Sequence, residues 1–173
     1  MVQAYARLNV PDEQKQYYRQ IATDARVVEC VPMSDVFSSG QLRFLKERAG
    51  YKTQRKMCYK NASDLVEAVE LLRRMYAIPT EPAIYVEGYT LGGGVLPIEH
   101  AFVRIGDKYV DPTFEMALHK DVRKEQYVAL AEFDRSELRK LQLETCYYGG
   151  MYQYAYMKKH RPDLAVFMAY RGK

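Results

Sequence analysis

The chain has 173 residues and a formal net charge of +4, and 48% of its residues are hydrophobic and 28% are charged. This length suits a single domain over residues 1–173, with a core that needs no metal or disulfide framework. The three cysteines are an odd number without paired spacing, which argues against a disulfide-stabilised secreted protein. The sequence lacks the apolar run of a secretory signal and any stretch of transmembrane length. We therefore expect a cytoplasmic protein in a reducing compartment, with no membrane partner.

The mild positive charge argues against a dedicated nucleic-acid-binding protein, because no dense tract of Lys and Arg accompanies it. Tyrosine is the unusual residue, with 16 copies against 6 Phe and no Trp. Many of these tyrosines lie in segment 146–160 (CYYGGMYQYAYMKKH). Their rings are suited to stacking on bases or on proteins, but packing between helices is the more ordinary explanation.

Residues 1–50 are expected to form a helical cap on the centre of the chain. Pro11 and the acidic residues after it predict a helix that continues to about Thr23. A short strand is expected at 26–31. A second helix is expected to start at Ser34-Asp35, with a kink at 38–40 and an end near Gly50.

The strongest helical pattern runs from Asn61 to Tyr76, where apolar residues recur at the i, i+3, i+4 spacing. Asn61 or Ser63 is a suitable N-cap, which places Cys58 at the helix N-terminus or within one turn of it. A strand is expected from Pro82 to Tyr89. The glycine-rich segment 91–97 lacks the lysine and helix of a phosphate-binding loop, so we expect a loop that borders a cleft.

A tight hairpin is predicted after this loop. Gly106-Asp107 separates the β-rich segments 99–105 and 108–110, and such a dipeptide favours a two-residue turn. The turn fixes the strand register by pairing Ile105 with Lys108.

This register predicts that an imidazole and a carboxylate share one face of the hairpin. Counting back from the turn, Asp111 lies opposite Phe102 and diagonal to His100. Diagonal neighbours are about 7–8 Å apart, a distance that a carboxylate and an imidazole can bridge.

Cys58, His100 and Asp111 together supply the thiol, imidazole and carboxylate of an activated sulfur nucleophile. A helix N-terminus and a neighbouring imidazolium both favour the thiolate form of a cysteine. His100 would transfer the proton, and Asp111 would hold the imidazole in the required tautomer. Backbone N–H groups at the helix start, and more weakly the side chain of Gln54, are candidate donors to an oxyanion.

The remaining Cys and His residues are assigned structural roles. Cys30 and Cys146 are expected to be packing residues, and His119 and His160 to be exposed. The three candidate catalytic side chains are also possible zinc ligands, but their wide spacing lacks the paired motif of zinc sites. We therefore expect no metal and no cofactor.

The C-terminal part, residues 123–173, is expected to contain a strand and helices. The segment 127–133 has strand character, and a capped helix should run from Asp134 through Cys146. Gly149-Gly150 then separates this helix from a helical tail that extends to about His160.

The central segment resembles the transglutaminase-like branch of the papain-like cysteine enzymes. The resemblance covers about residues 54–114 and rests on three pieces: Cys58 opening a helix, His100-Ala101 followed by an aromatic residue, and a strand that ends in Val110-Asp111-Pro112-Thr113. The separations of 42 residues from Cys58 to His100 and 11 residues to Asp111 suit that core. So does the strand that ends in Gly88-Tyr89.

The resemblance implies an α+β fold, in which a central helix packs on an antiparallel sheet, and a Cys–His–Asp triad that acts through a thioester. The expected activity is that of a hydrolase or acyltransferase on an amide bond of a protein, a peptide or a small amide or amine substrate. Residues near the triad are candidates for the substrate cleft: Tyr59, Asn61, Glu87, Glu99 and Phe102. Phe102 stands where that family usually has Trp, and Tyr59 follows the cysteine in place of a Trp-rich neighbourhood. The alternative is a binding module for nucleic acid or protein that keeps the scaffold without catalysis.

Overall fold

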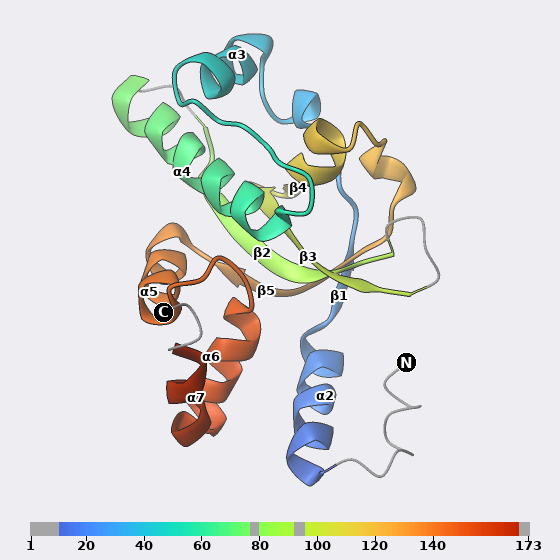
Figure 1. Cartoon of the computed structure of the whole chain (residues 1–173). Coiled ribbons are helices and arrows are strands. Elements are labelled where there is room, and N and C mark those ends of the chain that lie inside the picture. Colours follow the sequence, from blue (N-terminus) through green and yellow to red (C-terminus); the bar gives the residue numbers. More distant parts are fainter. Residues whose placement is uncertain (1–10, 77–79, 92–95, 170–173) are drawn as a thin grey trace.

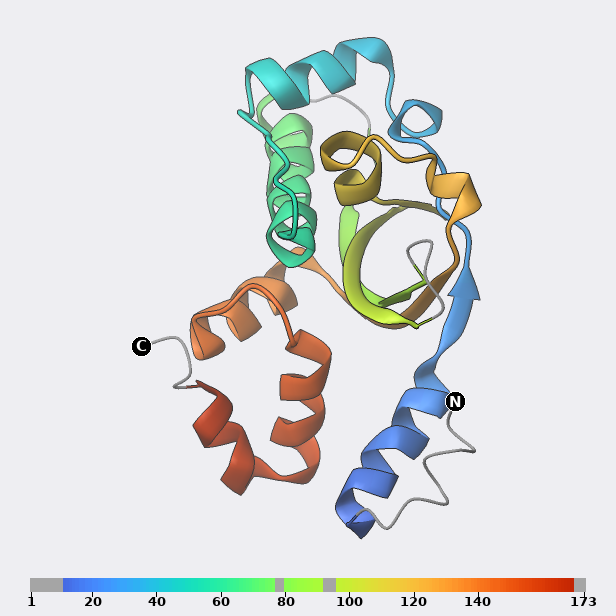
Figure 2. The same cartoon turned by 45° about the vertical axis from the view of Figure 1, so that its right-hand side comes forward.

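The structure is a computed structural model that describes residues 11–76, 80–91 and 96–169. It has an α+β fold in which a long helix, α4 (Cys58–Tyr76), packs on a curled antiparallel sheet (Figures 1 and 2). The five strands lie in the order β1-β5-β2-β3-β4: β1 (Arg26–Val28), β2 (Ala83–Thr90), β3 (Ile98–Ile105), β4 (Lys108–Val110) and β5 (Tyr127–Phe133). The other helices are α2 (Asp12–Asp24), α3 (Ser39–Glu47), α5 (Arg135–Thr145), α6 (Met151–His160) and α7 (Pro162–Ala169).

The main core lies between α4 and the sheet. Leu65, Val69 and Leu72 are fully buried on α4, and they share this core with Ala101 and Val103 of β3. The apolar spacing predicted for this helix is therefore confirmed. Its burial excludes water from a broad apolar surface, which is the dominant stabilising contribution in a domain of this kind.

A second core lies on the opposite face of the sheet. Side chains alternate along a strand, so Phe102 points away from α4 while its neighbours point toward it. Phe102 packs there with Val86 of β2, Phe114, and Tyr127 and Ala129 of β5. The sheet is thus buried on both faces.

The hairpin register predicted from the sequence is confirmed. Ile105 pairs with Lys108 and Val103 pairs with Val110, so β3 and β4 are joined by two residues. Gly106 has a φ of 61°, the left-handed conformation that a glycine adopts without strain. Asp111 follows Val110 directly and therefore continues on the face that the sequence predicted.

The N-terminal segments differ from the prediction of a single helical cap. Helix α2 is confirmed, but it lies at the opposite end of the molecule from α3 (Figure 1). The expected start of the next helix at Ser34 was wrong, because that residue lies in a short 3₁₀ turn, Met33–Asp35. Helix α3 starts later because Ser38 and Gln41 form a capping box, in which each side chain accepts the other residue's N–H group.

The C-terminal strand and helix predicted at 127–146 are confirmed, and Asp134 forms a capping box at the start of α5. Three elements were missed: the π-helical turn Thr113–Ala117, the 3₁₀ turn Val122–Lys124 and helix α7. A single turn is too short to show a hydrophobic period. Helix α7 (PDLAVFMA) is apolar over most of its length, so its sequence has no amphipathic pattern.

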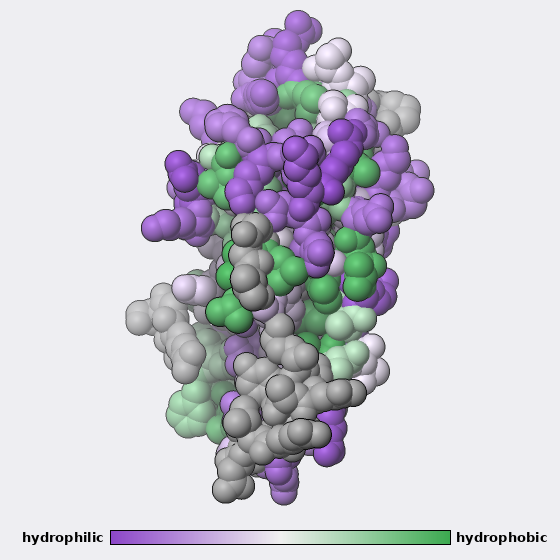
Figure 3. Space-filling model, turned by 90° about the vertical axis from the view of Figure 1, so that its right-hand side faces the viewer, coloured by the Kyte–Doolittle hydropathy of each residue, from purple (hydrophilic) through white to green (hydrophobic). Residues whose placement is uncertain are grey.

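The outer surface mixes polar and apolar areas. Figure 3 shows hydrophilic side chains over the upper part of one face and hydrophobic side chains gathered across its middle. Within the part of the chain that the structure describes, no helix is both long and apolar enough to cross a membrane.

Gly88 is required by a close approach of two strands. The pairing of β2 with β5 shifts register between Glu87 and Gly88, and a Cβ atom on Gly88 would lie 1.8 Å from the carbonyl oxygen of Val128. We expect Gly88→Ala to lower the free energy of unfolding by about 3 kcal/mol, because backbone atoms must move to admit the methyl group. Denaturant unfolding followed by circular dichroism measures this change.

Gly40→Ala is the matched control. Its Cβ atom would lie 3.9 Å from the nearest atom, Ser38 Oγ, inside helix α3. This variant should keep or raise stability by up to about 1 kcal/mol. Equal stabilities of the two variants would contradict the close approach at Gly88.

Candidate active site

His100 and Asp111 form a buried pair. The imidazole Nε2 atom lies 2.7 Å from Asp111 Oδ2, and the two side chains are 3% and 0% exposed. The prediction that they share a face and meet is confirmed. Buried polar groups need hydrogen bonds to replace those that they lose with water. The segments around the pair supply these hydrogen bonds.

Asp111 receives three further hydrogen bonds besides its contact with His100. Its Oδ1 atom accepts the backbone N–H groups of Thr113 and Phe114 at 2.9 and 3.1 Å. Its Oδ2 atom accepts the hydroxyl of Tyr127 at 3.0 Å. Asp111 therefore acts as the cap of the π-helical turn and as the partner of His100 at once.

Sequence reasoning missed these supporting groups. An Asp followed by Pro is a signature of a helical N-terminus, since Asp caps N–H groups and Pro fits the first position. Asp111-Pro112 carried that signal, although it was interpreted as the end of a strand followed by a loop. Tyr127 gave no local signal. Strands β2 and β3 lie between β5 and β4 in the sheet, and its hydroxyl reaches Asp111 only because the sheet is curled (Figure 2).

Aromatic rings hold the imidazole of His100. The ring centroid of Phe114 lies 4.9 Å away, and those of Tyr127 and Phe102 lie 6.4 and 6.5 Å away. These contacts restrict rotation of the imidazole and exclude water from the face of the sheet where the pair lies. The His100 ring is thus held in a fixed orientation, with one nitrogen committed to Asp111.

Cys58 completes the arrangement. It is the first residue of α4, it is half-buried, and its side chain interacts with the imidazole of His100. Burial acts to lower the pKa of His100, but the carboxylate of Asp111 and the side chain of Cys58 outweigh it and raise that pKa to about 10. At neutral pH the ring therefore keeps its proton, which is the state that stabilises a thiolate and that donates a proton to a leaving group.

Asn61 joins the segments that carry the triad. Its side chain bonds both the N–H and the carbonyl of Gln54, at 2.9 and 2.8 Å, and donates to Thr113 Oγ1 at 3.0 Å. The loop before Cys58 is thereby fixed to the turn after Asp111. The prediction that Asn61 or Ser63 caps the helix was wrong, because α4 starts three residues earlier and the Asn61 side chain is occupied elsewhere.

The candidate cleft residues take different roles. Phe102 and Asn61 are fully buried, so they support the site from behind instead of lining a cleft. Tyr59 donates to Glu99 Oε2 at 3.3 Å, and Glu99 is exposed beside His100. The side chain of Gln54, the oxyanion candidate, is exposed on the loop before Cys58.

Glu87 is buried and holds the start of helix α6. Its carboxylate accepts the N–H groups of Met151 and Tyr152, at 3.0 and 2.8 Å, and the hydroxyl of Tyr85 at 2.8 Å. Burial raises the pKa of Glu87, while these three hydrogen bonds oppose that rise. A carboxylate at a helix N-terminus is favourable because it compensates the helix dipole.

The other cysteines and histidines have different surroundings, and only Cys30 packs with the residues around His100 and Asp111. Cys30 is buried as predicted, and burial and the charge of Asp111 raise the pKa of its thiol. The prediction that Cys146 is a packing residue was wrong, because it is exposed in a left-handed conformation at the end of α5. His119 and His160 are exposed, as predicted.

Two alternative interpretations receive no support from the geometry. Among the described residues, no group of three or more His, Cys, Asp and Glu side chains is placed to hold a metal ion. The tyrosines of α6 at positions 152, 154 and 156 are buried in helix packing, whereas Tyr147 and Tyr148 before α6 are exposed. The glycines of segment 91–97 lie at 92–94, outside the described residues.

Comparisons with models of protein families, with curated proteins and with solved structures found no match to this chain. The chemistry of the site is therefore inferred from its geometry alone. That geometry comprises a half-buried cysteine at a helix N-terminus, an imidazole that interacts with it and a buried carboxylate in contact with the imidazole.

The raised pKa of His100 makes stability depend on pH. The ordinary value is 6.5 and the folded value is about 10, so the stabilising contribution of the imidazolium is complete below pH 6.5 and is lost as pH rises toward 10. We expect the stability advantage of the wild type over His100→Gln to shrink by about 1.4 kcal/mol per pH unit across this range. Urea unfolding of both proteins between about pH 6 and pH 9 measures it.

His119→Asn is the control for this titration, because His119 is exposed and its φ of 54° suits asparagine. If its difference from the wild type varied with pH in the same way as that of His100→Gln, the pH dependence would not be specific to His100. A constant difference for His100→Gln would mean that His100 is not protonated in the folded protein.

Tyr127→Phe tests the support of the carboxylate. This change removes one donor to the buried Asp111, and a hydrogen bond to a charged group contributes about 1.5–3 kcal/mol. We expect the free energy of unfolding to fall by about that amount in a denaturant titration. Tyr147→Phe, at an exposed tyrosine, should leave stability unchanged. If the two variants behave alike, the hydroxyl of Tyr127 does not hold Asp111.

Proposed function

We propose that the protein is a thiol-dependent hydrolase or acyltransferase that acts on an amide bond through a thioester. The observation that carries this proposal is the buried His100 ring, which contacts Asp111 and also interacts with the side chain of Cys58. Its pKa of about 10 keeps it protonated at neutral pH. A protein, a peptide or a small amide would serve as the acyl donor.

The proposed reaction has two halves. The sulfur of Cys58 attacks the carbonyl carbon and forms a C–S bond, and His100 gives its proton to the amine nitrogen as the C–N bond breaks. Water or a second amine then attacks the thioester carbonyl and gives a proton to His100, and the sulfur leaves as thiolate. Asp111 holds the imidazole in one orientation and balances its charge through both halves.

The oxygen of the attacked carbonyl group becomes negatively charged and needs hydrogen-bond donors. The first backbone N–H groups of α4 lie next to Cys58, and a helix N-terminus offers such groups together with a favourable dipole. The exposed side chain of Gln54 is the second candidate donor. Its main chain is fixed by Asn61, which limits how far the side chain moves from the sulfur.

A transglutaminase-like core within a single domain is part of this proposal. Its support is the order of the elements: a helix that opens with Cys58, then a strand, then the strand with His100, then the strand that precedes Asp111. The Trp that this family usually has is absent, and Phe102 packs beside the imidazole in its place. Because the chemistry needs a reduced sulfur, we place the protein in a reducing compartment such as the cytoplasm.

The test is the rate at which iodoacetamide alkylates each cysteine in the folded protein at pH 7, located by mass spectrometry. Cys146 is exposed and far in sequence from the triad, so it serves as an internal reference. We expect Cys58 to react at least about ten times faster than Cys146, because its side chain interacts with the imidazole of His100 at the N-terminus of α4. Cys30 should react most slowly, because it is buried.

Substitution of His100 shows whether the alkylation rate of Cys58 depends on the imidazole or only on the solvent exposure of the sulfur. In His100→Gln, the rate at Cys58 should fall about ten-fold or more, while the rate at Cys146 stays the same. Equal rates at Cys58 and Cys146 in the wild type would contradict the proposal. In that case the scaffold would act as a binding module for protein or nucleic acid.

A further inference from the structure

The positive charge of the protein is concentrated in one segment of the chain. Residues 43–60 contain seven Lys or Arg residues and a single acid, Glu47, so the net charge of this segment is +6. The whole chain carries +4, and the remaining residues together therefore carry −2. The basic residues of the segment are Arg43, Lys46, Arg48, Lys52, Arg55, Lys56 and Lys60. They lie on α3, in the loop that follows it and in the first turn of α4 (Figure 1).

Three of these residues, which we call the loop cations, lie in the loop immediately before the proposed nucleophile: Lys52, Arg55 and Lys56. Consecutive Cα atoms are about 3.8 Å apart, so the Cα atoms of Arg55 and Lys56 lie within about 11 and 8 Å of that of Cys58. At about 0.1 M salt, screening limits the interaction of exposed charges to about 10 Å. The loop cations can therefore act on a group that is bound at the sulfur.

The loop is fixed to the first turns of α4. The hydroxyl of Tyr51 donates to the carbonyl of Asn61 at 3.1 Å, and the Asn61 side chain bonds both main-chain groups of Gln54. Lys56 has a φ of 63°, a left-handed conformation that a lysine rarely adopts. The main chain that carries the loop cations thus has a defined path beside Cys58.

The loop cations have no partner in the part of the chain that the structure describes. Their side chains are exposed and form no hydrogen bond or ion pair there. In contrast, Arg104 binds Glu132, and two arginines of α5 bind Glu67. Because like charges that lie close together repel one another, the grouping of the loop cations does not stabilise the fold. It favours an anionic partner.

Lys52 also lines an open groove of about 460 Å³ between the loop and α4. Lys60, Asp64 and Glu67 line this groove as well, so its charge is mixed. Both carboxylates are engaged with other cations, since Asp64 pairs with Lys60 and Glu67 pairs with the two arginines of α5. The acids of the groove therefore do not compensate the charge of Lys52.

The chemistry at the sulfur favours a peptide over a nucleic acid as the anionic partner. The proposed reaction attacks an amide carbonyl, which a peptide supplies. Proteins that bind single-stranded nucleic acids combine positive charge with exposed rings on which bases stack. The aromatic residues of segment 43–58 are Phe44 and Tyr51, and both are buried. The loop thus offers charge without stacking surfaces.

We propose that the substrate of Cys58 is an acidic peptide, whose Asp or Glu side chains bind the loop cations. The inference rests on the proposed function, because it names the substrate class of the same thiol. An extended peptide advances about 3.4 Å per residue. Carboxylates within about three residues of the attacked carbonyl are therefore within the range of these charges.

The test uses two heptapeptides whose central residue carries a chloroacetyl group that alkylates cysteine. One peptide has Glu and the other has Gln at the two positions on each side of the centre, and both have Ala at the ends. At about 0.1 M salt, we expect the Glu peptide to label Cys58 about ten times faster than the Gln peptide, measured by mass spectrometry. At about 1 M salt, this preference should fall below about three-fold, because the screening length shortens to about 3 Å. The ratio of the two rates cancels any change in the reactivity of the sulfur itself.

Removal of the loop cations should have the same effect as high salt. In the variant Lys52→Gln/Arg55→Gln/Lys56→Asn, the preference for the Glu peptide should fall below about three-fold at about 0.1 M salt. All three side chains are exposed, and asparagine suits the positive φ at position 56.

The matched control removes the same charge from α3 and its C-cap, with the substitutions Arg43→Gln, Lys46→Gln and Arg48→Gln. Helix α3 packs beside the last turns of α4, where Gln41 and Arg73 both bind Thr80 (Figure 1). Arg73 lies about 22 Å along α4 from Cys58. The control should therefore keep the preference.

Equal rates for the two peptides in the wild type would overturn the proposal, as would a preference that survives high salt or the loop substitutions. So would a preference that the control loses to the same extent. If oligothymidylate protects Cys58 from iodoacetamide while the Glu peptide has no advantage, the loop cations bind nucleic acid instead.

Iodoacetamide is uncharged and separates this proposal from the proposed function. Rapid, His100-dependent reaction of Cys58 with iodoacetamide, without any preference for the Glu peptide, would overturn the acidic substrate alone. Reaction of Cys58 with iodoacetamide no faster than that of Cys146 would overturn the proposed function and the acidic substrate together.

Discussion

The structure of the site depends on one buried carboxylate. Asp111 has no exposed surface. Its Oδ2 atom contacts the imidazole of His100 and accepts a hydrogen bond from the hydroxyl of Tyr127, and its Oδ1 atom accepts hydrogen bonds from two backbone N–H groups of the turn that follows. A charge placed so far from water is tolerated only when its hydrogen-bonding capacity is filled. The same contacts fix the end of β4, the π-helical turn and β5 relative to one another. The folding of this region and the chemistry of the imidazole therefore have a common electrostatic basis.

The sequence was sufficient to predict the elements whose signals are local. The apolar spacing of α4 follows from burial of one helix face, and the two-residue turn at Gly106-Asp107 sets the register that brings His100 and Asp111 to one face. The register is well determined because a shift of one residue would move every side chain to the other face. The contact between imidazole and carboxylate was thus accessible from alternation alone.

Other features depend on contacts between distant segments and left no local signal. Tyr127 reaches Asp111 because the curl of the sheet brings β5 near the end of β4, although two strands lie between them. Glu87 holds the start of α6 across more than sixty residues. The start of α4 was placed too late because Asn61, a good capping residue, is used instead to bind Gln54 and Thr113. For Asn61, a tertiary contact replaced the capping role that the residue type suggested. For Tyr127 and Glu87, the contact partners are too far away in the sequence to be recognised.

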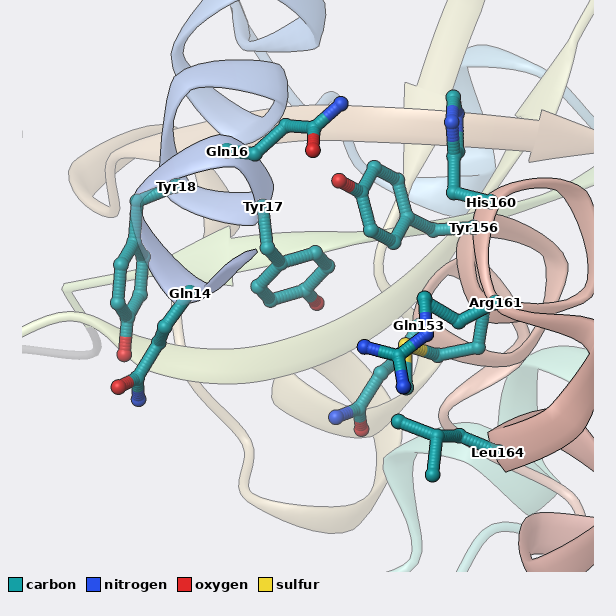
Figure 4. A pocket seen from close by; sticks show the side chains of 10 residues that line it. Gln14, Gln16, Tyr17, Tyr18, Gln153, Tyr156, His160, Arg161 and Leu164 are labelled. Atoms are coloured by element: carbon teal, nitrogen blue, oxygen red, sulfur yellow. The ribbon is translucent and has the colours of Figure 1, made fainter. Parts of the chain in front are cut away.

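A pocket of about 360 Å³ lies between helix α2, near the beginning of the chain, and helices α6 and α7, near its end (Figure 4). Its two walls are therefore made of parts of the polypeptide that are synthesised at different times. A nascent chain would complete α4 and the sheet before it acquires the second wall. Any change that loosens α2 or α7, such as proteolytic trimming or a fused tag, would act first on this space and only secondarily on the core between α4 and the sheet.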